Sequence, residues 1–128
     1  MEWDAFDLIY RGKKIEIKSA AYIQFWHTDK FSKIIFNIGA KREYDYSTRK
    51  YSTEIKRKAD VYDFCLLKEK DVNNLDPLNM NHWEFYIVLT KDLDERFPEQ
   101  KTISLTSLEK ISPKVKYGEL KEIMDQLI

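Results

Sequence analysis

The chain has 128 residues, 43% of them apolar, and its 22 basic residues balance its 22 acidic residues. This composition predicts one folded domain, residues 1–128, that buries a core without disulfides. Cys65 is the single cysteine, which excludes a disulfide framework within the chain and a Cys-x-x-Cys zinc site. No apolar run approaches the roughly 18 residues of a membrane span, and no signal peptide begins the chain, so we expect a cytoplasmic protein.

Charge is unevenly distributed along the chain. Residues 41–58 carry seven basic and three acidic side chains, whereas residues 59–128 carry nine and fourteen. The first 58 residues therefore have a net charge of +5 and the remainder −5. A molecule with one basic side is compatible with a transient nucleic-acid partner.

A β-hairpin is predicted near the start of the chain. Two strand-like runs, residues 5–10 and 15–20, flank a polar turn, and Gly12 suits the first central position of a type II′ turn. With Gly12 and Lys13 as the two-residue loop, Asp7 lies opposite Lys18. Because side chains alternate along a strand, Asp7, Glu16 and Lys18 then share one face.

Two carboxylates on one patch repel each other, and a divalent cation with oxygen ligands from both keeps them ionised. The spacing Asp-x8-Glu-x-Lys of Asp7, Glu16 and Lys18 resembles the motif of the PD-(D/E)xK nuclease superfamily, which includes restriction enzymes, junction resolvases and repair nucleases. Residues 15–26, 58–67 and 82–93 also resemble small bacterial and mobile-element proteins assigned to that fold.

The resemblance implies a restriction-endonuclease-like fold and a metal-dependent phosphodiesterase that acts on DNA. It places Mg²⁺ or Mn²⁺ on Asp7, Glu16 and the backbone carbonyl of Ile17. Lys18 would orient the attacking water or stabilise the charge of the transition state. Gln24 is a further catalytic candidate, with a structural polar residue as the alternative.

Other interpretations stay open. Further Asp/Glu-x-Lys copies begin at Glu54, Glu99 and Glu119, outside apolar strands, and an exposed hairpin face with surface ion pairs would look the same at residues 7–18. The superfamily usually has a helix before the hairpin, yet six residues precede Asp7. Three alternatives follow from this departure. A homodimer or another partner supplies the missing helix, or the chain is a fragment or subunit of a larger nuclease. In the third alternative, the chain is an inactive module that binds DNA or protein.

The polar segment 40–59 follows a third predicted strand at residues 33–38 and is predicted to be a loop or a solvated excursion. Its basic residues alternate with tyrosines, as in surfaces that contact phosphates and stack on bases. An ordinary solvated loop is the alternative. The candidate nucleic-acid-binding residues are Lys41, Arg42, Arg49, Lys50, Lys56, Arg57 and Lys58.

Apolar runs dominate the second half of the chain. Residues 59–67 predict a central strand, and residues 83–90 predict a second buried strand whose Thr90 caps a helix over 91–97. Residues 102–105 predict a short strand before a capping box at Thr106–Glu109. Residues 117–127 predict an amphipathic helix. Together these elements predict an α/β (α+β) domain: a mixed sheet with an N-terminal hairpin, flanked by short helices and a C-terminal helix.

Overall fold

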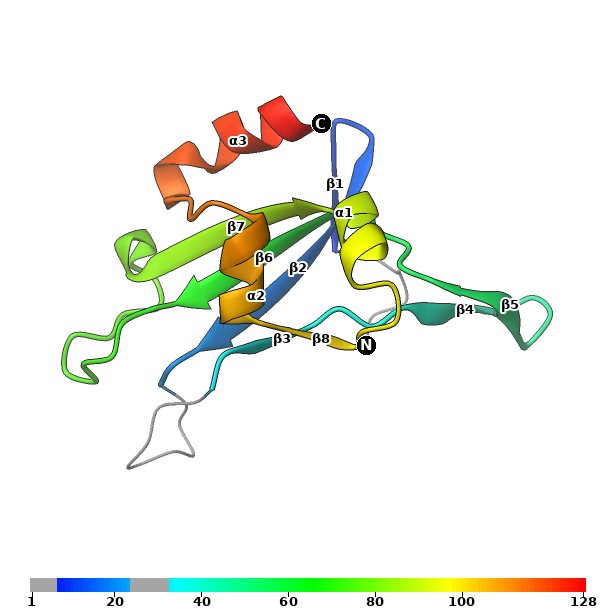
Figure 1. The fold of residues 1–128 in the computed structure, drawn as a ribbon, viewed down its shortest axis with the longest axis horizontal. Helices are drawn as coiled ribbons and strands as arrows, with labels where there is room; N and C mark the ends of the chain where they lie inside the picture. Colours follow the sequence, from blue (N-terminus) through cyan, green and yellow to red (C-terminus); the bar gives the residue numbers. More distant parts are fainter. Residues whose placement is uncertain (1–6, 24–32) are drawn as a thin grey trace.

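The computed structural model describes residues 7–23 and 33–128, without the side chains of residues 41–45 and 51–55. A four-stranded sheet forms its centre, in the order β1-β2-β6-β7 (Figure 1). Its strands are β1 (Leu8–Tyr10), β2 (Lys13–Ala21), β6 (Val61–Leu67) and β7 (Trp83–Leu89). β2 and β6 are parallel, and the other two pairs are antiparallel. The sheet is thus mixed and begins with a hairpin, as the sequence predicts.

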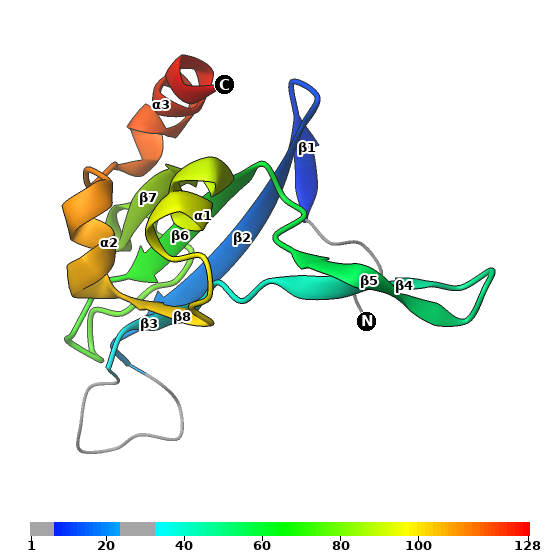
Figure 2. The ribbon, with the colours of Figure 1, turned by 45° about the vertical axis from the view of Figure 1, so that its right-hand side comes forward.

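Two small antiparallel sheets accompany the central one. β3 (Ile35–Asn37) pairs with β8 (Thr102–Ser104), and β4 (Lys41–Asp45) pairs with β5 (Lys50–Lys56). The β4–β5 hairpin extends away from the central sheet (Figure 2). Of the two alternatives predicted for residues 40–59, the loop is therefore wrong, and the hairpin is instead an excursion from the body of the molecule. The segment shows no apolar periodicity in its sequence, and this periodicity is the signal by which strands are recognised.

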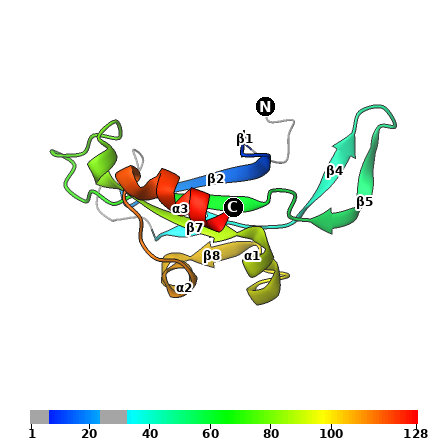
Figure 3. The same ribbon diagram turned by 90° about the horizontal axis from the view of Figure 1, so that it is seen from above.

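Short helices follow the strands: α1 (Thr90–Arg96), α2 (Leu105–Ile111) and α3 (Leu120–Leu127), with 3₁₀ turns at Met80–His82 and Tyr117–Glu119. Figure 3 shows α1, α2 and β8 together on one side of the sheet. α3 packs on the other face, because Met124 contacts the cluster of Ile15, Val61 and Ile87. The sheet is therefore covered on both faces.

The largest apolar cluster lies between the sheet and the layer of β3, β8, α1 and α2. Phe64 of β6 is fully buried at its centre, and its ring meets that of Phe36 at 5.1 Å between centroids. Leu93 of α1 and Leu108 of α2 are also fully buried in this cluster. Burial of each such side chain contributes roughly 1.5–3 kcal/mol, so this cluster holds the helices on the sheet.

Helix starts differ from the predicted ones. α1 includes Thr90, whose hydroxyl is buried without a hydrogen-bond partner and does not cap the helix. Ser104 caps α2 by accepting a hydrogen bond from the amide of Ser107, so the predicted capping box at Thr106 is wrong. Pairing of β8 with β3 keeps the chain extended through Ser104, and the helix begins at the next residue. The predicted C-terminal helix starts as a 3₁₀ turn and becomes α-helical at Leu120.

Arg57 joins the base of the β4–β5 hairpin to the helical layer. Its side chain is 1% exposed. Its Nε donates to the carbonyl oxygen of Ile38 at 2.6 Å, and Nη1 donates to the carboxylate of Asp94 at 2.8 Å. Nη2 donates to the carbonyl oxygens of Phe97 at 2.7 Å and Gln100 at 3.1 Å. The prediction that Arg57 contacts nucleic acid is therefore wrong, because its donors point into the protein.

We expect Arg57→Ala to lower the free energy of unfolding by about 3 kcal/mol or more, because three carbonyl groups and a carboxylate lose their donor. Urea denaturation measures the loss. Arg96→Ala, at an exposed arginine in the last turn of α1, is the matched control and should cost less than about 1 kcal/mol. Equal losses in the two variants would contradict a structural role for Arg57.

Candidate functional site

The hairpin that carries the predicted site turns one residue earlier than expected. Its two-residue loop is Arg11 and Gly12, with φ angles of 51° and 79°. Positive φ at both positions defines a type I′ turn, so the predicted type II′ turn at Gly12 and Lys13 is wrong. Gly12 fits either turn, because glycine adopts positive φ without a steric penalty. The sequence pattern therefore does not distinguish the two turns.

The change of turn alters the cross-strand partners without altering the faces. Leu8 pairs with Ile15, so Asp7, the residue before β1, comes next to Glu16 in this register instead of Lys18. The partner shifts by two residues, and the alternation of side chains has a period of two. Asp7 therefore keeps the same parity as Glu16 and Lys18.

Asp7 is held at the edge of β2. Its Oδ2 accepts a hydrogen bond from the backbone amide of Ile17 at 2.6 Å, and its own amide donates to the carbonyl oxygen of Ile15 at 2.9 Å. Because Ile17 follows Glu16 directly, standard bond lengths place this carboxylate oxygen at most about 5.5 Å from the Cα of Glu16. The amide and carbonyl of one strand residue point to the same edge in an antiparallel ladder, so the carbonyl of Ile17 also faces the Asp7 side.

Glu16 and Lys18 form an ion pair next to this edge. Lys18 Nζ lies 3.1 Å from Glu16 Oε1, and the two side chains are 21% and 12% exposed, respectively. Glu16 shares its face with its β6 neighbour Tyr62. The pKa of Tyr62 is raised to about 12, first by burial and then by the negative charge of Glu16. The negative charge of Glu16 therefore acts on Tyr62 at a part of the sheet face that is partly shielded from water.

The structure therefore brings together Asp7, Glu16, Ile17 and Lys18, and Gln24 lies outside the described residues. Two carboxylates and a backbone carbonyl are the hard oxygen donors that Mg²⁺ and Mn²⁺ prefer, so their chemistry fits such an ion. Within residues 7–23 and 33–128, no group of three or more His, Cys, Asp or Glu side chains is arranged to hold a metal. The predicted metal ligands include two such side chains, Asp7 and Glu16, and the third predicted ligand is the backbone carbonyl of Ile17.

The predicted nucleic-acid-binding residues fall along the β4–β5 hairpin. Arg49 and Lys50 are exposed at its tip, beside Tyr46, which is 56% exposed. At its base Lys56 is exposed and Lys58 is half-buried. Lys41 and Arg42 lie on β4, opposite Lys56 and Ile55 in the register.

Asp63 is a polar feature of the sheet that the sequence analysis missed. It lies in β6 opposite Ile17, on the face that α3 partly covers, and burial raises its pKa to about 6. The thiol of Cys65 contacts its carboxylate at 3.6 Å. The signal in the sequence is an aspartate between Tyr62 and Phe64 in an otherwise apolar strand. Its face is opposite to that of Glu16, so it does not belong to the same cluster.

Comparisons with protein-family models, with curated proteins and with solved structures found no match to this chain. Within the described part of the chain, no helix is long and apolar enough to cross a membrane.

We expect Asp63→Asn to stabilise the protein by about 1–2 kcal/mol at pH 7.5. The folded chain keeps the Asp63 proton up to a pKa of about 6, whereas an unfolded aspartate releases it near about 3.9. The free energy of unfolding of the wild type therefore falls as pH rises from about 4 to about 6, and the asparagine variant avoids this fall. Urea denaturation across pH should show the gain disappearing below about pH 4.

Glu95→Gln is the control for this experiment, since Glu95 is exposed on α1. It should change the free energy of unfolding by less than about 0.5 kcal/mol at every pH. A gain in Asp63→Asn that stays constant from pH 4 to 7.5 would show that ionisation of Asp63 is not its cause.

Proposed function

We propose that this chain is a metal-dependent phosphodiesterase that acts on DNA, a small relative of the PD-(D/E)xK nucleases. One observation supports this best. The carboxylate of Asp7 sits on the amide of Ile17, between the residues of the Glu16–Lys18 ion pair. Two acids, one amine and one strand carbonyl are thereby gathered at one sheet edge, in the combination that phosphodiester hydrolysis with a divalent ion uses.

Each residue has a defined part in this proposal. Asp7, Glu16 and the carbonyl of Ile17 would hold Mg²⁺ or Mn²⁺. The bound ion supplies Lewis acidity toward a phosphate oxygen and lowers the pKa of a coordinated water. Lys18, now paired with Glu16 at 3.1 Å, would stabilise the negative charge that develops on the phosphate or orient the water.

The same contacts favour a second candidate, a nuclease-like module that binds DNA or protein without cleavage. Both carboxylates have partners in the absence of any ion: Asp7 accepts from the Ile17 amide, and Glu16 pairs with Lys18. An inactive descendant would keep such contacts because they stabilise the hairpin. A homodimer, or a partner that provides a helix with a further acid, would complete the site under the first proposal.

Metal titration separates the two candidates. For a site of millimolar affinity, about 10 mM Mg²⁺ or Mn²⁺ should raise the melting temperature by about 5 °C, since ligand binding adds roughly 1.4 kcal/mol. Glu16→Gln should remove this shift. Lys18→Ala should leave the melting temperature within a few degrees and abolish DNA cleavage. Differential scanning fluorimetry and a plasmid-nicking assay provide the measurements.

Glu99→Gln is the matched control, because Glu99 begins another Glu-x-Lys copy on an exposed loop. It should retain the full metal-dependent shift. The inactive candidate predicts a different result. High metal concentration should not shift the melting temperature, and Glu16→Gln should leave the stability of the protein nearly unchanged. A wild type that shows neither metal stabilisation nor cleavage would refute the proposal that the residues of this chain alone make a metal-dependent phosphodiesterase.

A further inference from the structure

The β4–β5 hairpin, residues 41–56, forms an arm that extends from the body of the molecule (Figures 1, 2 and 3). Seven residues of β5 span about 24 Å at the usual strand rise. The turn at the tip contains Arg49 in the left-handed region, with φ of 56°, and residues 46–50 are all exposed. The arm thus presents a narrow, two-stranded, solvent-exposed tip.

The base of the arm is fixed in place. Arg57 directly follows β5 and donates to the carbonyl of Ile38, three residues before the start of β4, so the two strands are held together at their base. Ile38 also donates its amide to the carbonyl of Lys101 at 2.9 Å. Because these bonds are buried or part of β pairing, the direction of the arm relative to the sheet is set by the fold.

The arm also starts near the candidate site. The amide of Asp60 donates to the carbonyl of Lys14 at 2.8 Å, and the amide of Lys14 donates to the carboxylate of Asp60 at 2.9 Å. Glu16 is aligned with Tyr62 in the parallel register, and Lys58 precedes Tyr62 by four residues. Four residues span at most about 14 Å, so Lys58 at the base of the arm lies within that distance of Tyr62, the neighbour of Glu16.

The charge of this segment selects an anionic partner. The arm itself, residues 41–56, contains five basic and three acidic side chains, and it is followed by the buried Arg57 and the half-buried Lys58. Residues 59–128 are acidic overall. The arm is thus the basic pole of a molecule without net charge, and an approaching polyanion is attracted to it.

We propose that the arm lies in the major groove of double-stranded DNA, with Arg49 and Lys50 at the base edges or phosphates of the groove and Lys56 on the backbone near the body. A two-stranded β-ribbon fits this groove. Single-strand binding, in contrast, relies on aromatic platforms within a basic groove, and the described tip offers one tyrosine, Tyr46. This inference rests on the proposed function for its choice of DNA as the partner.

Binding is measured by fluorescence anisotropy in EDTA, with a labelled duplex of about 20 base pairs and the same strand unpaired. The wild type should bind the duplex at least about tenfold more tightly than the single strand. Arg49→Glu with Lys50→Glu should weaken duplex binding by about 10- to 100-fold and reduce the slope of log K against log salt by about 2, since two phosphate neutralisations are lost.

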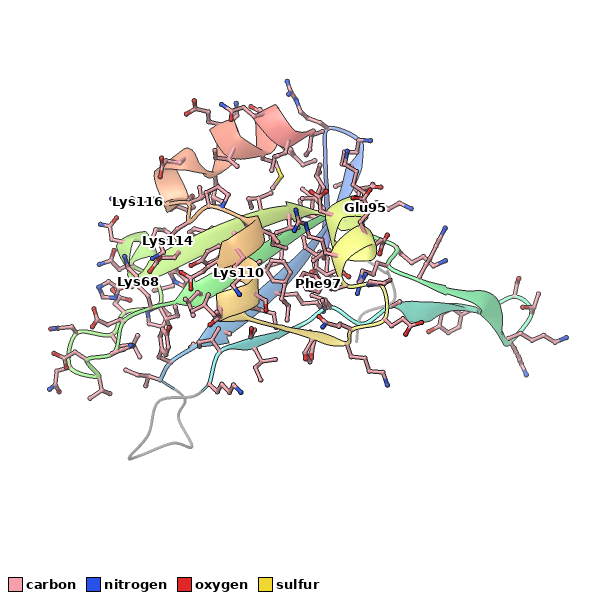
Figure 4. The ribbon with its side chains drawn as sticks, in the orientation of Figure 1. Lys68, Glu95, Phe97, Lys110, Lys114 and Lys116 are labelled. Carbon is pink, nitrogen blue, oxygen red and sulfur yellow. The ribbon has the colours of Figure 1, made fainter. Side chains whose placement is uncertain are left out.

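The control reverses two exposed lysines far from the arm, Lys110→Glu with Lys116→Glu (Figure 4). It has the same net charge as the arm variant, so a loss confined to the arm variant excludes a general charge effect. Urea denaturation of both variants verifies that they are folded. The exposed positions of the tip predict midpoints close to that of the wild type.

Chemical probing identifies the groove. Guanine N7 lies in the major groove, so the wild type should protect it from methylation and the arm variant should not. Protection of adenine N3 alone, tighter binding to the single strand, or equal losses in the arm and control variants would each overturn the proposal. Duplex binding through the arm without metal stabilisation or cleavage would refute the phosphodiesterase proposal and support the proposed role of the arm. DNA cleavage by the wild type, together with unchanged duplex binding by the arm variant, would refute only the proposed role of the arm.

Discussion

The buried guanidinium of Arg57 is the interaction on which the arrangement of the layers depends. It contacts four groups from the end of β3, from α1 and from the loop before β8, and it follows β5 directly. Transferring a charged group from water into a protein is costly unless each donor finds an acceptor. Arginine can satisfy several acceptors at once because its donors form a rigid planar fork, whereas a lysine offers a single ammonium. The position of the arm therefore depends on this one side chain.

The β1–β2 hairpin is held on both sides in a comparable way. At its tip, the hydroxyl of Tyr10 donates to Asp125 of α3 at 2.6 Å, and Arg11 lies 3.3 Å from the same carboxylate. Along its other edge, Lys14 exchanges two hydrogen bonds with Asp60. Asp7 and Glu16 thus lie on a hairpin anchored by the C-terminal helix and by the base of the arm. A site built on anchored strands keeps its geometry better than one built on loops.

Much of the central sheet could be predicted from the sequence, because β6 and β7 are buried on both faces and appear as nearly continuous apolar runs. The two strands of the arm could not be predicted, because their residues show no apolar periodicity. The shared face of Asp7, Glu16 and Lys18 follows from alternation alone and is independent of the turn. The turn type does not follow from the sequence, because Gly12 fits both the type I′ turn and the type II′ turn.

Arg57 and Asp63 show where sequence patterns fail in a different manner. Arg57 stands between Lys56 and Lys58, and a basic run predicts a solvated surface. Arg57 points inward because the carbonyl groups of Ile38, Phe97 and Gln100, from distant parts of the chain, accept its hydrogen bonds. Asp63 lies within an apolar strand. Its sequence neighbours indicate that the strand is buried, but they do not indicate whether a positively charged group lies next to the carboxylate. Tertiary contacts decide both cases.

The contacts of the two carboxylates bear on the order of events in the proposed reaction. Under the proposed function, the Ile17 amide and Lys18 would compete with a metal ion for Asp7 and Glu16, so the free protein should hold such an ion weakly. A substrate phosphate adds oxygen ligands and offers Lys18 another anion, which favours metal binding once DNA is present. An arm that holds the duplex close to β2 raises the local concentration of those phosphates, as tethering does in any two-site interaction. Under this proposal the arm would increase the affinity of the site for a metal ion without contacting the ion.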